Sequence, residues 1–304
     1  MDMEEIRAFV AIARLRGFSC AAATLHRSQP AISRRIEFLE RELGAPLFQR
    51  VRGGVTLTDA GAAFLPYAET VLAAEKDGAE AVRALRKGYA GRISLALVGT
   101  LANASLTGLL RQFRRSHPKI RIDLQTATSQ QVGELVQRGE ATLGLRYLAD
   151  RRPGLVCETV AEEALLVVGC SDHRLADGRR HRPHELAGEH WVAFPARAAR
   201  ESFVQFLERK LLAAGLEDPE IIPIDSLTAQ KRLVEAGFGI ALLAESGIEE
   251  ERRLGTLRVL DVPALRASLP VTVVYRRNAY VSEAARSLLS AIAAAGRRDA
   301  TRCH

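Results

Sequence analysis

The chain has 304 residues, of which 43 are Lys or Arg and 36 are Asp or Glu, giving a formal net charge of +7. This length exceeds that of one small domain and predicts two or three core units. The positive balance fits a polyanionic partner. No apolar run approaches the roughly 20 residues of a membrane span, and the N-terminus lacks the apolar segment of a secretion signal. Since the four cysteines are scattered, we expect them to be reduced and the protein to be cytoplasmic.

The first 43 residues predict three short helices. Apolar positions in residues 3–14 share one helical face, and Gly17 is expected to end that helix. A second helix over residues 19–25 contains alanines that permit close helix crossing, and a short polar link then leads to a third helix over residues 29–43.

The third helix has clear boundaries. Ser28 is a good N-cap, Pro30 falls in the first turn, and Gly44 provides a stop. Its expected apolar stripe consists of Ile32, Ile36, Leu39 and Leu43. The positions off the stripe include Gln29, Ser33, Arg34, Glu37 and Arg41. Such a pair of helices predicts a helix-turn-helix, whose second helix enters the DNA major groove. The alternative is an ordinary helical hairpin with a solvated polar face.

Residues 45–58 read as two short strands around a Gly-Gly turn, which together form a wing. Arg50 and Arg52 are expected to point outward, where they can enter the minor groove or grip phosphate. Thr58 caps a long helix that is expected to reach Lys87 and to end at Gly88. This helix, roughly 45 Å long at 1.5 Å per residue, has too little local core for its apolar stripe and should pair with a second chain. Alternatively, it lies on its own downstream domain.

From Arg92 onward, strands alternate with helices. Strands are expected at 92–98, 120–127, 142–145, 164–169, 191–194, 221–224, 240–243 and 270–275, and helices at 103–116, 129–138, 200–214, 226–236 and from 282 to about 295. This alternation predicts an α/β fold with mostly parallel sheets and helices on both faces. The basic residues 296–304 lack apolar periodicity and are expected to be disordered.

The N-terminal segment resembles the DNA-binding domain of LysR-type transcriptional regulators. The residues that carry this likeness are Phe9-Val10, Gly17-Phe18-Ser19, Ala21-Ala22, Leu25, Ser28-Gln29-Pro30-Ala31-Ile32-Ser33, Ile36, Leu39-Glu40, Leu43-Gly44, Leu47-Phe48-Gln49-Arg50 and Val55-Thr56-Leu57-Thr58-Asp59-Ala60-Gly61. The pattern is long and nearly ungapped. In many relatives the arginine at the wing tip aligns with Gly53, one place after Arg52.

The likeness is less specific in the C-terminal part, where it rests on residues 139–145, 172–176 and 237–243. Thr142 stands where relatives usually have Asp, and Ala244 where many have Pro. The resemblance implies an N-terminal winged helix-turn-helix, a long linker helix and a two-lobed, periplasmic-binding-protein-like effector domain. The expected bounds are 1–58 for the DNA-binding domain, 59–90 for the linker and 91–296 for the effector domain, with a tail at 297–304. Lobe I would comprise about 91–161 and 267–296, and lobe II about 162–266.

The expected partners are double-stranded promoter DNA, a small-molecule effector, a second copy of the chain bound through residues 59–90, and further copies in a tetramer. RNA polymerase is an additional candidate. The expected DNA-binding residues are Ser28, Gln29, Pro30, Ser33, Arg34, Arg50 and Arg52. Among them, the arginines should contact phosphate, while Gln29 and Ser33 should read bases.

The effector site is expected beyond the carboxyl ends of the first three strands of the α/β part, where free N–H groups at helix N-termini favour anions. The candidate residues are Thr100, Leu101, Thr128 and Arg146, with Phe194, Pro195 and Phe203 on the opposite lobe. These residues suit a small carboxylate, with Arg146 as its anchor. Alternatively, Arg146 forms a surface or lobe-bridging salt bridge, and the two threonines are simple helix caps.

Other functional classes have weaker support. Cys170, His173, His181, His184 and His190 superficially match zinc spacing, but several arginines among them would repel a cation. We therefore expect no metal, cofactor or catalytic residue. A redox switch between Cys157 and Cys170 is a further alternative, although no thiolate-stabilising cluster adjoins either thiol. An enzyme would need a nucleophile elbow or a phosphate loop, and neither pattern occurs. A plain solute-binding protein would carry a secretion signal and no winged domain.

Overall fold

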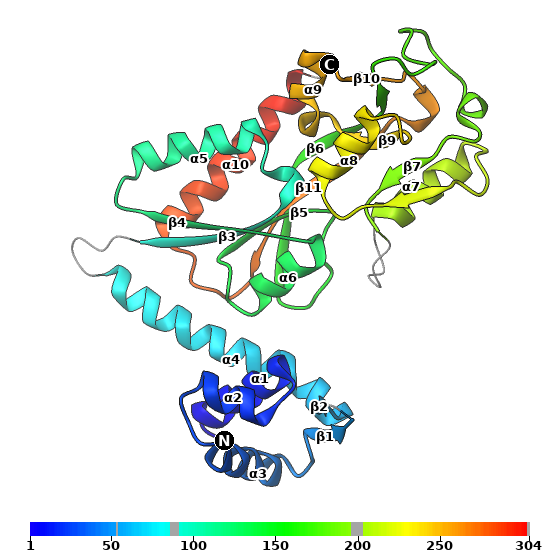
Figure 1. Ribbon diagram of the computed structural model, residues 1–304. Coiled ribbons are helices and arrows are strands. Elements are labelled where there is room, and N and C mark those ends of the chain that lie inside the picture. Colours follow the sequence, from blue (N-terminus) through cyan, green and yellow to red (C-terminus); the bar gives the residue numbers. More distant parts are fainter. Residues whose placement is uncertain (53, 86–90, 196–202, 303–304) are drawn as a thin grey trace.

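The computed structural model describes residues 1–52, 54–85, 91–195 and 203–302, with backbone alone over 297–302. A small helical N-terminal part, a long helix and a larger α/β part follow one another along the chain (Figure 1). This arrangement confirms the predicted fold class. Among the described residues, no helix is long and apolar enough to cross a membrane.

The N-terminal part contains α1 (Met3–Leu15), α2 (Phe18–Thr24), α3 (Gln29–Leu43) and the hairpin strands β1 (Phe48–Val51) and β2 (Gly54–Leu57). The prediction that Gly17 ends α1 was wrong, because Arg16 occupies the left-handed conformation there with φ 51°. Gly17 is extended and begins α2 instead. The Arg16 carbonyl accepts the N–H of Val55 at 3.2 Å, which ties this corner to the wing.

A compact core holds these elements together. Phe9 is fully buried, with its ring 5.3 Å from that of Phe48 and 5.1 Å from that of Phe64. The small side chains of Ala21 and Ala22 are also buried and let α1, α2 and α3 cross closely. The predicted stripe of α3 was wrong at its last position, because Leu43 is 40% exposed beside the helix end.

The long helix α4 (Asp59–Ala84) begins as predicted, with the Thr58 hydroxyl accepting the N–H of Gly61 at 3.1 Å. Its 26 residues correspond to about 39 Å. The predicted helix end at Lys87 and Gly88 lies outside the described residues. Toward the C-terminal end of α4, Val82 and Leu85 are 67% and 86% exposed, so the described part of the chain does not cover this apolar surface.

The main sheet of the larger part is mixed, not mostly parallel as predicted. Its order is β10-β6-β11-β5-β3-β4, with β9 also paired to β6. These strands are β3 (Arg92–Val98), β4 (Arg121–Ala127), β5 (Leu143–Tyr147), β6 (Leu155–Cys170), β9 (Ala241–Ala244), β10 (Leu257–Val259) and β11 (Ala267–Arg276). The strand β3 is parallel to β4 and β5, whereas β11 is antiparallel to β5 and β6. Alternating strands and helices predict parallel pairs only where a helix connects two neighbouring strands. The strands β6 and β11 are instead long antiparallel strands that run from one half of the larger part to the other.

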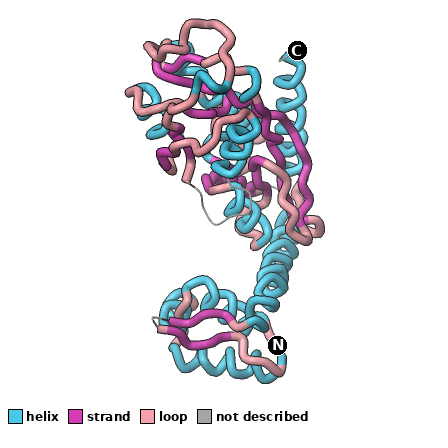
Figure 2. The backbone as a smooth tube through the Cα atoms, turned by 90° about the vertical axis from the view of Figure 1, so that its right-hand side faces the viewer, coloured by secondary structure: helices cyan, strands magenta, loops and turns pink. Residues whose placement is uncertain are grey.

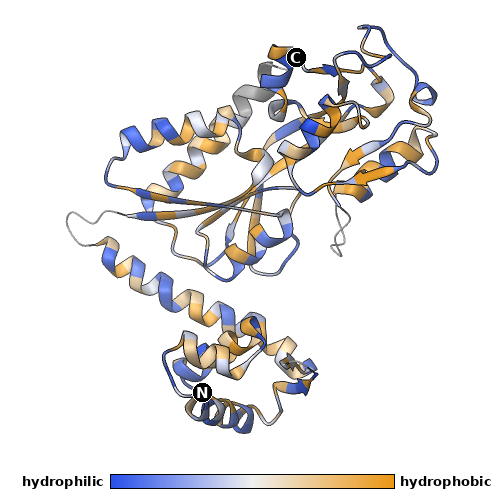
Figure 3. Cartoon of the chain, in the orientation of Figure 1, coloured by the Kyte–Doolittle hydropathy of each residue, from blue (hydrophilic) through white to orange (hydrophobic). Residues whose placement is uncertain are grey.

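We call the half around β3, β4 and β5 lobe I. Alternating residues of β3 face opposite layers: Ile93 and Leu95 pack toward α5 (Ala104–Ser116) and α10 (Glu283–Arg302), and Ala96 packs against α6 (Ser129–Gln137). Figure 3 shows that hydrophobic residues are frequent along the strands of the main sheet. The prediction of a disordered tail was wrong as far as Arg302, because α10 continues to that residue.

The other half is lobe II. It contains a parallel pair, β7 (Trp191–Ala193) with β8 (Ile221–Pro223), and the helices α7 (Phe203–Ala213), α8 (Leu227–Glu235) and α9 (Glu249–Leu254). The predicted helix start at residues 200–202 lies outside the described residues. Trp191 is fully buried at the centre of this lobe.

Candidate DNA-binding surface and effector cleft

The start of α3 presents polar groups at an exposed surface. Ser28 caps the helix through its hydroxyl, which accepts the N–H of Ala31, and Pro30 lies in the first turn. Gln29 and Arg34 are exposed, and Ser33 is partly exposed. The Ser19 hydroxyl of α2 donates to Gln29 Oε1 at 3.0 Å. This bond fixes the Gln29 side chain against the preceding helix, which sequence reasoning did not foresee.

The far half of α3 carries an aromatic residue between two cations. Phe38 is 42% exposed, and the guanidinium groups of Arg34 and Arg41 lie 5.5 and 5.3 Å from its ring centre. The spacing i, i+4 and i, i+3 brings these groups together on one helix face. Phe38 thereby holds Arg34, which sequence reasoning had identified only as a separate charge.

The wing is attached directly to α3. A carboxylate oxygen of Glu40 accepts the N–H groups of Leu47 at 2.6 Å and Phe48 at 3.3 Å. Arg50 and Arg52 are exposed on this hairpin as predicted, and the adjoining Gly53 lies outside the described residues. Among the described residues, neither arginine forms an ion pair with a carboxylate, so both charges are available to an anion. Figure 2 shows the wing strands and α3 at the end of the molecule farthest from the larger part.

A cavity of about 830 Å³ lies between the two lobes. The ends of β3, β4 and β5 contribute Thr100, Thr128 and Arg146, and lobe II contributes Phe194, Pro195 and Phe203. These six predicted residues therefore meet at one cavity. Leu101 does not belong to its lining, because its side chain is buried in the lobe I core. Leu101 is the last residue of a one-turn helix (Gly99–Leu101), which turns its side chain inward.

Arg146 forms a nearly buried ion pair with Asp150 and donates from Nε to the Tyr147 carbonyl at 3.2 Å. The salt bridge considered as an alternative for Arg146 is therefore present, although it joins residues of the same lobe. Asp150 was missed because nothing in its loop sequence marks it as a buried residue. An anionic ligand would have to share or replace this carboxylate.

The two threonines of the cavity have different hydrogen bonds. The Thr128 hydroxyl caps α6 by accepting the N–H of Gln131 at 3.3 Å, which confirms the alternative that this threonine is a helix cap. The Thr100 hydroxyl instead donates to the Tyr147 phenol oxygen at 3.0 Å. Burial raises the pKa of Tyr147 well above its ordinary value, so this phenol is neutral at physiological pH.

The histidine cluster and the cysteine pair have structural explanations. His181 lies between Asp177 and Glu185, with nitrogen–oxygen distances of 2.9 and 3.2 Å. Among the described residues, no group of three or more His, Cys, Asp or Glu side chains could hold a metal ion. Cys157 and Cys170 lie near opposite ends of β6, roughly 40 Å apart at about 3.3 Å per residue. A disulfide needs Cα atoms within about 7 Å, so the alternative of a redox switch through a Cys157–Cys170 disulfide was wrong.

A winged helix-turn-helix connected by a long helix to an α/β part with a cavity between its lobes defines a ligand-responsive DNA-binding regulator. The family models agree. "Bacterial regulatory helix-turn-helix protein, lysR family" matches residues 3–62, and "LysR substrate binding domain" matches residues 86–297. The chain belongs to the LysR family of transcriptional regulators.

Individual relatives support this assignment. The chain is 30% identical to the HTH-type transcriptional regulator TfdS of Cupriavidus pinatubonensis, over 92% of this chain and 94% of TfdS. It is 29% identical to the HTH-type transcriptional regulator CbbR of Rhodospirillum rubrum, over 97% of each chain. These relatives are regulators, which confirms the expectation that the chain is not an enzyme.

Solved structures extend the likeness to the whole fold. The crystal structure of CbnR, a LysR family transcriptional regulator, is 26% identical with a TM-score of 0.66, covering 97% of this chain and 99% of CbnR. Full-length CbnR complexed with its target DNA is 27% identical with a TM-score of 0.64, covering 98% of this chain and 99% of that one.

Proposed function

We propose that the chain binds promoter DNA through α3 and the wing, and that a small anion in the cavity between the lobes controls this binding. In the proposed complex Ser28 and Pro30 fix the start of α3, and Gln29 and Ser33 meet base edges. Arg34, Arg50 and Arg52 meet phosphates, which makes binding steeply salt dependent. The exposed charges of these arginines support this division of roles.

We further propose that α4 pairs two chains and that the functional unit is a dimer or a tetramer. The exposed Val82 and Leu85 support a partner at this helix. The domain limits proposed are 1–58, 59–90 and 91–296. Because it would bind promoter DNA, the protein would act in the cytoplasm, with RNA polymerase as a further partner.

The observation that carries the effector proposal is the position of the cavity at the carboxyl ends of β3, β4 and β5. Ligands of open α/β sheets bind at such ends, and the N-terminus of α6 adds N–H groups that favour an anion. Arg146 supplies the positive charge, and Phe194 and Phe203 supply aromatic walls. A small carboxylate, including an aromatic one, fits this combination.

The test is the melting temperature of the full chain with benzoate, succinate and the neutral analogue benzamide. A ligand that binds the folded state raises the midpoint, by an amount that grows with its concentration. Removing Arg146 alone would leave the nearly buried Asp150 with only the Arg152 guanidinium, 3.5 Å from its Oδ1, as an ionic partner. The variant should therefore be Arg146→Gln combined with Asp150→Asn. Arg121→Gln, which removes an exposed arginine of lobe I, is the matched control.

We expect acids, but not benzamide, to raise the midpoint of the wild type and the control. The double variant should lose this rise. An equal rise for benzoate and benzamide would contradict an anionic effector, and an acid-specific rise that survives in the double variant would remove Arg146 from the anchor role.

A further inference from the structure

The larger part contacts α4 at the C-terminal end of α6. Glu69 of α4 is only 6% exposed although it carries a carboxylate. Arg14 of α1 lies 3.2 Å from one of its oxygens, and Arg138, the C-cap of α6, lies 2.8 Å from the same oxygen. One buried carboxylate therefore joins an arginine of the DNA-binding part to an arginine of the effector part.

Further contacts surround this joint. Arg14 also pairs with Glu140 at 2.7 Å, directly beyond α6. Lys76 of α4 donates to the Gly139 carbonyl at 2.6 Å. Figure 1 shows α6 lying between α4 and the main sheet. Most of these charged and polar bonds converge on residues 138–140, and Arg276 of β11 adds a further one by donating to Asp77 of α4 at 2.9 Å.

The packing at this joint is close. Gly139 has φ +67°, and a Cβ at this position would lie 2.9 Å from the Cβ of Ala73. Ala73 is itself buried on α4. Glycine therefore both permits the left-handed turn after α6 and allows the two backbones to approach.

The opposite end of α6 forms a wall of the cavity, through Ser129, Gln130 and Gln131. Asp150, the partner of Arg146, is packed against the same helix: a Cβ at Gly133 would lie 1.9 Å from Asp150 Oδ2. Any displacement of Asp150 therefore changes its contact with α6. The helix has nine residues and is about 13 Å long, so its two ends move together as a rigid element.

We propose that α6 couples the occupancy of the cavity to the DNA-binding part through Glu69. An anion that draws Arg146 away from Asp150 leaves Asp150 to Arg152, whose N–H donates to Asp150 Oδ1 at 3.1 Å and whose guanidinium donates to the Gln130 carbonyl of α6 at 2.9 Å, so the bonds at this end of α6 rearrange. The helix then shifts, and the contacts of Arg138 and Gly139 with α4 shift with it. Because Glu69 also holds Arg14 at the end of α1, the change reaches the helix-turn-helix of the same chain. This inference rests on the proposed control by an anion.

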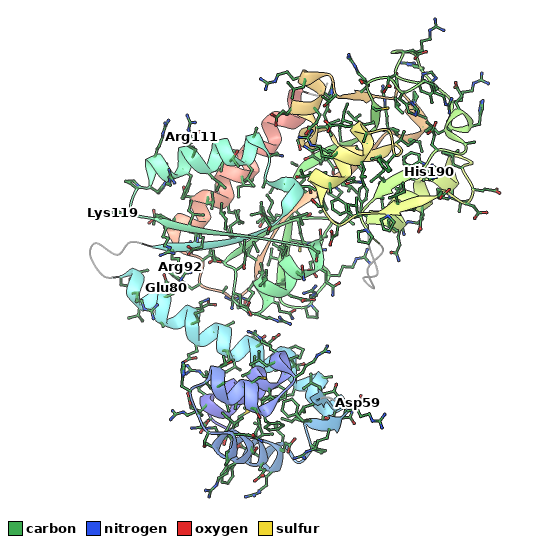
Figure 4. The ribbon with its side chains drawn as sticks, viewed as in Figure 1. Asp59, Glu80, Arg92, Arg111, Lys119 and His190 are labelled. Carbon is green, nitrogen blue, oxygen red and sulfur yellow. The ribbon has the colours of Figure 1, made fainter. Side chains whose placement is uncertain are left out.

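The test is a double-mutant cycle in the full chain, with affinity for DNA selected from a random pool as the measurement. Asp150→Asn replaces ligand binding as the perturbation at the cavity, because it weakens the hold on Arg146 without a change of size. Glu69→Gln removes the charge at the joint. Glu80→Gln, on the more distant part of the same helix (Figure 4), is the matched control.

We expect Asp150→Asn to change DNA affinity by about 5-fold or more, within the range typical of allosteric coupling. This change in DNA affinity should persist when Asp150→Asn is combined with Glu80→Gln. It should shrink to less than about twofold when Asp150→Asn is combined with Glu69→Gln. No effect of Asp150→Asn in the wild-type background, or fold-changes that multiply independently with Glu69→Gln, would overturn the proposal.

A second pair of variants tests the joint without changing any charge. Gly139→Ala places a methyl group against Ala73, whereas Gly178→Ala has a similar φ of +77° and meets no atom within 4 Å. Both variants share the cost of the left-handed conformation. Only Gly139→Ala should suppress the effect of Asp150→Asn on DNA affinity. Equal suppression by both would overturn the proposal.

The outcomes separate this inference from the proposed function. If the wild-type chain selects no DNA sequence, the proposed function fails and this inference fails with it. If the chain selects DNA and benzoate raises its melting temperature, but the double-mutant cycle shows independent effects, only the coupling through α6 is wrong.

Discussion

The attachment of the wing to α3 can be tested at Glu40. Its carboxylate accepts the N–H of Leu47 at 2.6 Å and that of Phe48 at 3.3 Å. Leu47 is buried, so water cannot replace the lost acceptor without local rearrangement. Glu40→Ala therefore leaves a buried N–H group unsatisfied at the root of the hairpin that carries Arg50 and Arg52.

The magnitude follows from the geometry. A hydrogen bond to a charged group contributes about 1.5–3 kcal/mol, and the longer bond to Phe48 contributes the smaller share. We expect the wing to lose about 2–3 kcal/mol of local stability in Glu40→Ala, which corresponds to roughly 30- to 150-fold in its opening equilibrium. Glu40→Gln keeps a neutral acceptor and should lose about half as much free energy.

Amide hydrogen exchange of residues 45–52 in the full chain measures this opening. Glu37→Ala is the control, because it removes the same charge from an exposed position of the same helix. Exchange in Glu40→Ala should be faster than in the wild type by roughly 30- to 150-fold. Exchange in Glu37→Ala should match the wild type within about threefold. Equal exchange in the two variants would refute the assignment of Glu40 as the attachment of the wing.

Three further predictions follow from the structure. Gln29→Ala should weaken binding to the selected DNA by about 1–3 kcal/mol and binding to random DNA much less, and Ser19→Ala should give a smaller loss of the same kind. Titrations with both DNAs measure these losses, and equal losses of affinity for the two DNAs would show that Gln29 does not read bases. Burial raises the pKa of Glu163 above its ordinary value of 4.5, so proton binding to Glu163 stabilises the folded state. The free energy of unfolding should therefore fall as pH rises from the ordinary pKa toward the raised pKa. Urea unfolding should show this fall in the wild type but not in Glu163→Gln. Val82→Glu should lower the molar mass measured by light scattering at micromolar concentration, and an unchanged mass would show that this face of α4 lies outside the oligomer interface.

Local signals predicted α3 to the residue. Ser28 and Gly44 are boundary residues whose preferences arise within a single turn of helix, so the bounds follow without knowledge of the fold. The same holds for Thr58 at the start of α4. The cavity residues at the ends of β3, β4 and β5 were also predictable, because strand ends in an α/β pattern meet at one edge.

Other features depend on contacts between distant segments. The 16 residues of β6 form one crossing strand, whose length was hidden because its first half lacks the apolar run of its second half. Gly296 was predicted to begin a disordered tail, yet it lies within α10, where a Cβ would be 1.9 Å from the Val160 carbonyl oxygen. This glycine therefore permits close packing of α10 on β6. The burial of Glu69 likewise arises only when Arg14 and Arg138 arrive from two separate parts of the chain.

The central claim is that a small anion between the lobes controls DNA binding by α3 and the wing. The most direct measurement is the affinity of the full chain for its selected DNA, with and without a carboxylate that raises its melting temperature. The account predicts a change in affinity or in the protected length of DNA when the acid binds, and no change with benzamide. An acid that occupies the protein while the DNA complex stays the same would contradict the account.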